Sequence, residues 1–140
     1  MLTIDTTTDF GKRVLKHLDD DVVVWLTTSR PGMAPQPSPV WFLWHDDALL
    51  IFSQPGTPKL RNIAANPNVA LNFNCTPEGG DVVVMTATAE VLAEQPAADV
   101  VDIYLTKYAR NIERLGSTPD AFLQAYSAPV LITPTSLRGH

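Results

Sequence analysis

Hydrophobic and polar positions along the chain predict mostly strands, with helical spacing in only a few segments. Six segments rich in Val, Ile, Leu and aromatic residues predict extended backbone; they cover 21–29, 34–44, 48–53, 68–75, 81–94 and 128–137. The first five are joined mostly by short turns, with one helix inserted. This order favours an antiparallel sheet rolled into a barrel over a doubly wound parallel sheet.

Apolar residues at helical spacing predict three or four helices; the segments are 7–20, 57–67, 96–112 and 118–126. Thr7 or Thr8 can cap the first helix, and Thr57 can cap the second, which has Pro58 in its first turn. The third has one apolar stripe, made of Val101, Tyr104, Leu105, Tyr108 and Ile112. We therefore expect one domain over residues 1–140, mainly β with flanking helices.

The predicted strand 34–44 has a proline at every second position from Pro35 to Pro39. Amides two residues apart point the same way in an extended chain, so the prolines remove donors from one side of the strand only. The amides of Gln36, Ser38 and Val40 remain able to donate toward the other side. Two explanations fit this pattern equally well: an edge strand protected against aggregation, or a strand along which a ligand lies.

Composition narrows the function classes. The chain has 140 residues and a net charge of −5, which argues against a generic nucleic-acid binder. It has no apolar run of the ~18 residues that a membrane span requires. The single cysteine, Cys75, ends an apolar strand and is expected to be a small buried residue in a reduced, cytoplasmic setting. His17, His45 and His140 are far apart in sequence, and no metal site is predicted.

The segment 57–67 places two cations near the start of a short helix in an acidic chain. Helix N-termini favour anions because their N–H groups are unpaired. At 100° per residue, Lys59 and Asn62 lie about 60° apart and share a side, whereas Arg61 projects about 160° from Lys59. Two explanations fit: an anion site, or an ordinary solvated basic face. No arrangement of nucleophile and base is found elsewhere, and no catalytic residue is assigned.

Taken in order, these segments resemble a known family. The stretch "VVWLTTSRPGMAPQPSPVWFLWHDDALLIFSQPGTPKLRNIAANPNVALNF" is similar to the split β-barrel flavoproteins typified by pyridoxamine 5′-phosphate oxidase. It is closest to the branch that uses the deazaflavin coenzyme F420. The likeness spans roughly residues 10 to 92 and includes the closing strand "PVLITPTSLRG". It implies a six-stranded antiparallel split barrel of the FMN-binding type, which forms a homodimer with two cofactor sites at the subunit interface.

The resemblance also implies roles for individual residues. Its "K-x-RN" motif would hold the phosphate region of the cofactor, and its "SPVW" strand would lie along the ring system. Its turn between the later strands would bring backbone from the partner subunit. The phosphate role falls on Lys59, Arg61 and Asn62, together with Ser53. The ring role falls on Ser38, Pro39, Val40 and Trp41, and the role of the turn falls on Gly79 and Gly80. Arg30 and Lys12 would meet a glutamate tail, or are ordinary surface charges.

The implied function is an F420-dependent reductase that passes a hydride from the reduced coenzyme to an electron-poor double bond of a small or planar substrate. FMN-using oxidases of this superfamily carry additional arginines and lysines along the second and third strands, and the stretch 37–52 has neither. Two alternatives remain: an FMN-dependent oxidase or reductase, and a non-catalytic F420-binding protein. The superfamily also has a haem-binding variant, but neither His17 nor His45 lies in a convincing ligand context.

Overall fold

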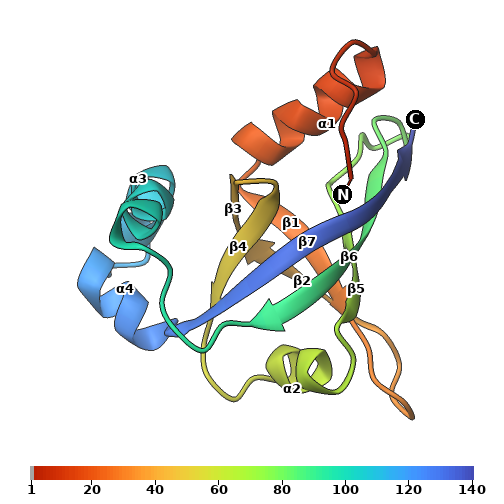
Figure 1. Ribbon diagram of the computed structural model, residues 1–140. Helices are drawn as coiled ribbons and strands as arrows, with labels where there is room; N and C mark the ends of the chain where they lie inside the picture. The colour runs from red at the N-terminus through yellow and green to blue at the C-terminus, as the bar shows by residue number, and fades with distance from the viewer. Residues whose placement is uncertain (1) are drawn as a thin grey trace.

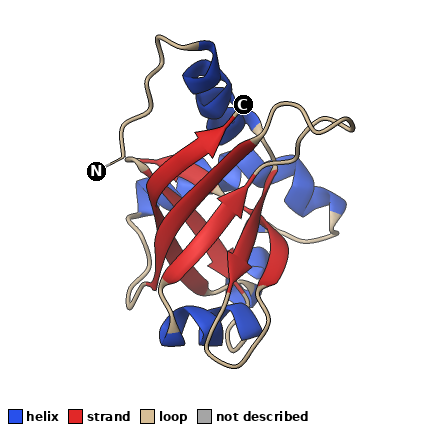
Figure 2. Cartoon of the chain, turned by 90° about the vertical axis from the view of Figure 1, so that its right-hand side faces the viewer, coloured by secondary structure: helices blue, strands red, loops and turns tan. Residues whose placement is uncertain are grey.

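One antiparallel sheet forms the body of the molecule in the computed structural model, which describes residues 2–140. Its strand order is β2-β1-β5-β6-β7-β4-β3, and every neighbouring pair is antiparallel. The strands are β1 (Val23–Thr28), β2 (Gln36–Trp41), β3 (Leu43–His45), β4 (Ala48–Ser53), β5 (Asn68–Asn72), β6 (Val83–Val91) and β7 (Ala128–Gly139). The sheet is strongly curled (Figures 1 and 2). The predicted mainly-β split barrel is confirmed.

The structure has seven strands rather than six because the predicted strand 34–44 is divided at Phe42. Its first part, β2, pairs with β1 at one edge of the sheet, and its second part, β3, pairs with β4 at the other edge. Phe42 is the only residue between the two parts. The chain therefore joins the two edges of the curled sheet covalently at this residue, and the barrel closes there.

The prolines of β2 lie at a sheet edge, as predicted. Pro37 is opposite Thr27 and Pro39 is opposite Trp25 on β1. Hydrogen-bonded and non-hydrogen-bonded pairs alternate in an antiparallel ladder, and a proline cannot donate. The amides between the prolines therefore face β1, and the prolines remove the donors from the free edge. This result supports the protective explanation for these prolines, since the backbone donors of Ser38 and Val40 are already used within the sheet.

Four helices flank the sheet: α1 (Asp9–Asp20), α2 (Pro58–Ala65), α3 (Ala98–Arg114) and α4 (Pro119–Ala125). Thr8 caps α1, since its hydroxyl accepts from the Gly11 amide at 2.9 Å. Helices α1 and α2 lie at opposite ends of the barrel, and α3 and α4 pack together along one side (Figures 1 and 2). None of the helices in residues 2–140 combines the length and the apolar character that a membrane crossing requires.

Strand β4 shows how the core is organised, because all six of its residues are buried. Leu49 and Ile51 point into the barrel and join its main cluster, whereas Leu50 and Phe52 join a second cluster beneath α3 and α4. A strand covered on both faces loses the usual alternation of apolar and polar residues, which explains the continuous apolar run "ALLIF". The second cluster forms the floor of the pocket described next. The expectation that Cys75 is buried was wrong, because it is exposed after β5.

Candidate functional site

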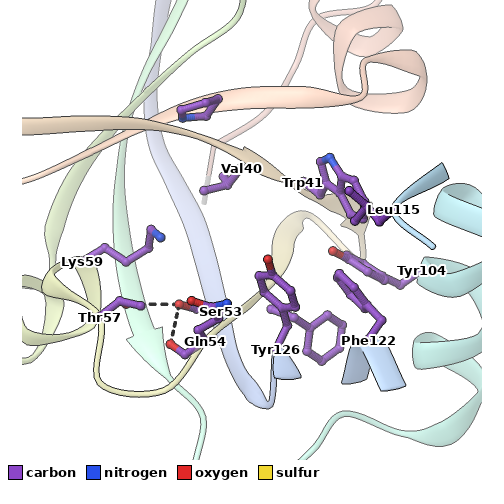
Figure 3. Close-up of a pocket in the computed structure, with 12 residues that line it drawn as sticks. Val40, Trp41, Ser53, Gln54, Thr57, Lys59, Tyr104, Leu115, Phe122 and Tyr126 are labelled. Carbon is purple, nitrogen blue, oxygen red and sulfur yellow. Dashed lines mark hydrogen bonds between the residues drawn. The ribbon is translucent and has the colours of Figure 1, made fainter. Parts of the chain in front are cut away.

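A pocket of about 300 Å³ lies where the end of β2, the end of β4, the start of α2 and the helices α3 and α4 meet (Figure 3). Its wall is polar toward α2 and aromatic toward α3 and α4. The lining residues are Pro39, Val40, Trp41, Phe52, Ser53, Gln54, Thr57, Lys59, Tyr104, Leu115, Phe122 and Tyr126. We call the side formed by Ser53, Gln54, Thr57 and Lys59 the polar end, and the side formed by Trp41, Tyr104, Phe122 and Tyr126 the aromatic end.

The polar end is built where β4 passes into α2. The Ser53 hydroxyl lies 2.9 Å from the Gln54 carbonyl oxygen, to which it donates, and 3.2 Å from the Thr57 hydroxyl. Thr57 is the N-cap residue of α2, but its side chain makes no capping bond. Thr57 therefore occupies the predicted cap position, although its hydroxyl does not accept a bond from the helix. The hydroxyl bonds to Ser53 instead and leaves the first amides of α2 without a side-chain acceptor.

Lys59 is the pocket's cation. It is half-buried in the first turn of α2, and its side chain extends toward the open centre of the pocket (Figure 3). Burial lowers the pKa of its ammonium group. Within residues 2–140, no carboxylate forms an ion pair with it. A partly desolvated cation without an acidic partner, in the first turn of a helix, is suited to hold an anion.

The other two residues of the "K-x-RN" motif do not line the pocket. Asn62 is buried, and its amide nitrogen donates to the Thr28 hydroxyl at 3.0 Å, which fastens α2 to β1. Arg61 is exposed, and its guanidinium donates to the Gly56 carbonyl at 2.6 Å. The structure thus brings Lys59 alone of these three into the pocket, together with Ser53. The side chains of Lys59 and Arg61 point in different directions, as their spacing along the helix predicts.

Of the residues expected along the ring system, Pro39, Val40 and Trp41 line the pocket and Ser38 does not. Gly79 and Gly80 form the β5–β6 turn, at the end of the barrel opposite α2 (Figure 1), and do not line the pocket. Lys12 is exposed on α1. Arg30 begins the turn 30–33, where the Met33 amide donates to its carbonyl. Neither of these two cations lines the pocket.

Three residues of the aromatic end were not predicted as site residues, namely Tyr104, Phe122 and Tyr126. The rings of Trp41 and Phe122 lie 5.5 Å apart at 24°, and those of Phe122 and Tyr126 lie 4.6 Å apart at 18°. Tyr104 packs at 6.4 Å and 23° against Phe122. Stacked aromatic walls of this kind suit a flat, apolar ring. The available signal was the repeated i, i+4 aromatic spacing in two successive helices, Tyr104 with Tyr108 and Phe122 with Tyr126.

Trp41 is held in place by the bend beside it. The Tyr108 hydroxyl accepts from the Phe42 amide at 2.8 Å and lies 2.7 Å from the Val22 carbonyl oxygen. The Lys107 ammonium donates to the Phe42 carbonyl at 2.9 Å and sits 3.8 Å above the Phe42 ring. The indole of Trp41 stacks on Tyr108 at 4.7 Å and 6°. Helix α3 therefore fixes the strand end that forms one wall of the pocket.

Comparisons with known proteins agree with this architecture. No curated protein sequence matches the chain significantly. Among solved structures, a FAD-binding protein from Mesorhizobium loti is 18% identical with a TM-score of 0.65, covering 91% of this chain and 89% of its own. The haem storage protein HutZ from Vibrio cholerae is 16% identical with a TM-score of 0.64, and the match covers 94% of this chain and 95% of HutZ.

An F420 reductase is 24% identical with a TM-score of 0.57, covering 86% of this chain and 92% of its own. Identities this low show a shared fold only. The sequence model of the pyridoxamine 5′-phosphate oxidase family, in contrast, matches residues 10–129, which include every strand through β6, the four helices except the first residue of α1, and the whole pocket lining. The chain therefore belongs to the pyridoxamine 5′-phosphate oxidase family.

Proposed function

We propose that the protein is an F420-dependent oxidoreductase whose pocket binds the phosphate of the deazaflavin at the polar end and its ring along β2. The observation that carries this proposal is Lys59, a half-buried cation with no acidic partner among residues 2–140. Burying part of an ammonium group is costly unless it gains a partner. A bound phosphate would supply that partner, and the Ser53 hydroxyl is placed to assist.

The remaining wall fits a flat ring system. Pro39 and Val40 line the pocket at the end of β2, and Trp41 supplies an aromatic face that stacks on Tyr108. The stretch 37–52 carries no lysine or arginine, and within the resemblance this favours the deazaflavin over FMN. These features support Pro39, Val40, Trp41, Ser53 and Lys59 as cofactor-binding residues. Asn62 would act indirectly, by fixing α2 against β1 through Thr28.

The coenzyme, when bound, supplies a hydride for an electron-poor double bond, and the protein supplies position. Well-oriented reactants gain roughly 7–11 kcal/mol from proximity alone. A site whose walls are hydroxyls, one lysine and aromatic rings can therefore accelerate the reaction by orientation and by excluding water. In this proposal Lys59 holds the anionic end, Trp41 fixes the ring plane, and the helices α3 and α4 enclose the reacting end.

We also propose that the site is completed in a homodimer. The β5–β6 turn with Gly79 and Gly80 lies at the end of the barrel away from its own pocket (Figure 1). If its backbone contributes to a cofactor site, as the resemblance implies, that site belongs to a second copy. Light scattering should then give a mass near twice 15.3 kDa. A monomer at micromolar concentration would contradict this part of the proposal.

The decisive experiment is a calorimetric titration of the purified protein with F420 and, separately, with FMN. We expect tighter binding of F420. The Lys59→Ala variant should lose roughly 1.5–3 kcal/mol of binding free energy, the range for a charge-assisted hydrogen bond. Lys16→Ala is the matched control, since it removes one exposed positive charge outside the pocket.

Three outcomes of the titration and a turnover assay would count against the proposal in different ways. Equal affinity of Lys59→Ala and wild type for F420 would show that the phosphate binds elsewhere. Preference for FMN would indicate an oxidase or reductase of the flavin type. Tight binding of reduced F420 without its oxidation, across a panel of conjugated acceptors, would indicate a binding protein without turnover.

A further inference from the structure

The phenol of Tyr104 is the pocket's most unusual polar group. The residue is only 1% exposed, yet its hydroxyl makes no hydrogen bond with any group in residues 2–140. Within residues 2–140, Arg30 Nε is the only fully enclosed side-chain nitrogen or oxygen that lacks a hydrogen-bond partner. The unpartnered Tyr104 hydroxyl is therefore not fully enclosed. What remains exposed of Tyr104 therefore includes its hydroxyl, which opens into the pocket that the residue lines.

Tyr108, one turn later on α3, shows what a satisfied phenol looks like in the same environment. Its hydroxyl lies within 2.8 Å of the Phe42 amide nitrogen, the Phe42 carbonyl oxygen and the Val22 carbonyl oxygen. Buried polar groups in folded proteins almost always find a partner. The free Tyr104 hydroxyl therefore indicates a partner that is not part of this chain's own fold.

Tyr126 supplies a second hydroxyl at the same place. It lies at the end of α4, with its ring stacked on Phe122, and its hydroxyl also has no hydrogen-bond partner in residues 2–140. Figure 3 shows the hydroxyls of Tyr104 and Tyr126 directed into the same open space beside Trp41. Burial raises the pKa of Tyr104, and the nearby phenols of Tyr108 and Tyr126 raise it further. Tyr104 therefore stays protonated and able to donate.

We propose that Tyr104 and Tyr126 form a two-donor site for an acceptor oxygen on a planar, uncharged, conjugated substrate. The stacked rings of Trp41, Phe122 and Tyr126 exclude non-planar ligands, and the pocket's cation lies at the other end. A carbonyl oxygen conjugated to a double bond meets these requirements, whereas an anion would have no cation there. This inference rests on the proposed function in assigning the polar end to the cofactor phosphate and in taking the hydride from the reduced coenzyme.

Two hydrogen bonds to a conjugated carbonyl have a chemical consequence for that substrate. When the β-carbon of an enone accepts a hydride, the electron pair of the carbon–carbon double bond moves onto the carbonyl oxygen and gives an enolate. A proton from water then completes the saturated ketone. Donors aimed at that oxygen stabilise the charge as it develops. Tyr104 and Tyr126 would thus select the substrate and also activate it.

The experiment compares coumarin with naphthalene, two flat bicyclic probes that differ chiefly in the lactone carbonyl and ring oxygen. Calorimetry is performed on the protein saturated with oxidised F420 and on the protein without it. Wild type should bind coumarin more tightly than naphthalene. Tyr104→Phe and Tyr126→Phe should each weaken coumarin binding about tenfold and leave naphthalene binding unchanged. The free energy of unfolding of Tyr104→Phe should not fall, because its hydroxyl has no partner in the fold.

Other results would overturn the inference. They are the absence of coumarin binding to wild type, equal losses for coumarin and naphthalene, or unchanged coumarin affinity in both Tyr variants. Weaker F420 binding by the Tyr variants, with coumarin unaffected, would assign the phenols to the cofactor ring and also overturn it. Failure of the proposed function has a separate signature, namely F420 binding that is insensitive to Lys59→Ala.

Discussion

The two ends of the pocket are built from very different lengths of chain. Ser53, Thr57 and Lys59 of the polar end lie within seven residues, across one strand-to-helix connection. The aromatic end combines Trp41 from β2 with Tyr104 from α3 and the rings of α4. A local connection needs only its own turn to be correct, whereas the aromatic end needs the whole packing of α3 and α4 on β4. Substitutions at the two ends should therefore have different consequences.

The largest effect is expected from Phe122→Ala at the aromatic end. Phe122 is 4% exposed and contacts rings on both sides. Its removal should lower the free energy of unfolding by about 3–5 kcal/mol, as for other buried aromatic residues. Chemical denaturation measures this. Leu115→Ala is the control, because Leu115 lines the same pocket but is 62% exposed; a loss as large as that of Phe122→Ala would contradict the comparison.

The next effect separates two tyrosines of α3, Tyr104 and Tyr108. Tyr108→Phe removes a hydroxyl that bonds to the backbone of Phe42 and Val22, and should cost about 1–3 kcal/mol of unfolding free energy. Tyr104→Phe removes a hydroxyl without a partner in residues 2–140 and should leave stability unchanged or slightly higher. The pair is measured in parallel by urea denaturation. Equal losses would show that the Tyr104 hydroxyl has a structural role.

At the polar end, Lys59→Met should change stability little while it weakens anion binding. Burial lowers the pKa of Lys59, so its charged form is disfavoured in the fold. Replacing it by an uncharged chain of similar length should leave the unfolding free energy within about 0.5 kcal/mol of wild type or raise it. Thermal unfolding without ligand tests this expectation. A clear destabilisation would mean that Lys59 serves the fold rather than a ligand.

A further effect concerns Lys107, which supports the aromatic end from outside the pocket. Burial lowers its pKa to about 8, below the ordinary value of 10.5. Between these values the unfolded chain holds a proton that the folded chain has released, so stability should rise with pH from about 8 to 10.5. Denaturation at pH 8 and pH 9.5 measures the slope, which Lys107→Met should reduce. A wild-type slope of the opposite sign would contradict the assignment.

The comparison also explains what the sequence could predict. The mainly-β barrel followed from short apolar segments joined by turns, and the position of Lys59 followed from Pro58 and helical spacing. The division of strand 34–44 at Phe42 did not, because Tyr108 and Lys107 bond to that residue from a helix 65 or more positions away. Likewise, Tyr104 and Tyr108 occupy the same apolar stripe, and only the packed structure shows which hydroxyl is left free.

The central claim is that one pocket binds a phosphate at Lys59 and a flat ring beside Trp41. A crystal structure of the protein with oxidised F420 tests it most directly. We expect the phosphate within hydrogen-bonding distance of the Lys59 ammonium and the ring along Pro39, Val40 and Trp41, with the hydroxyls of Tyr104 and Tyr126 still free of the phosphate. Coenzyme bound at another surface, with Lys59 left without an anion, would contradict the account.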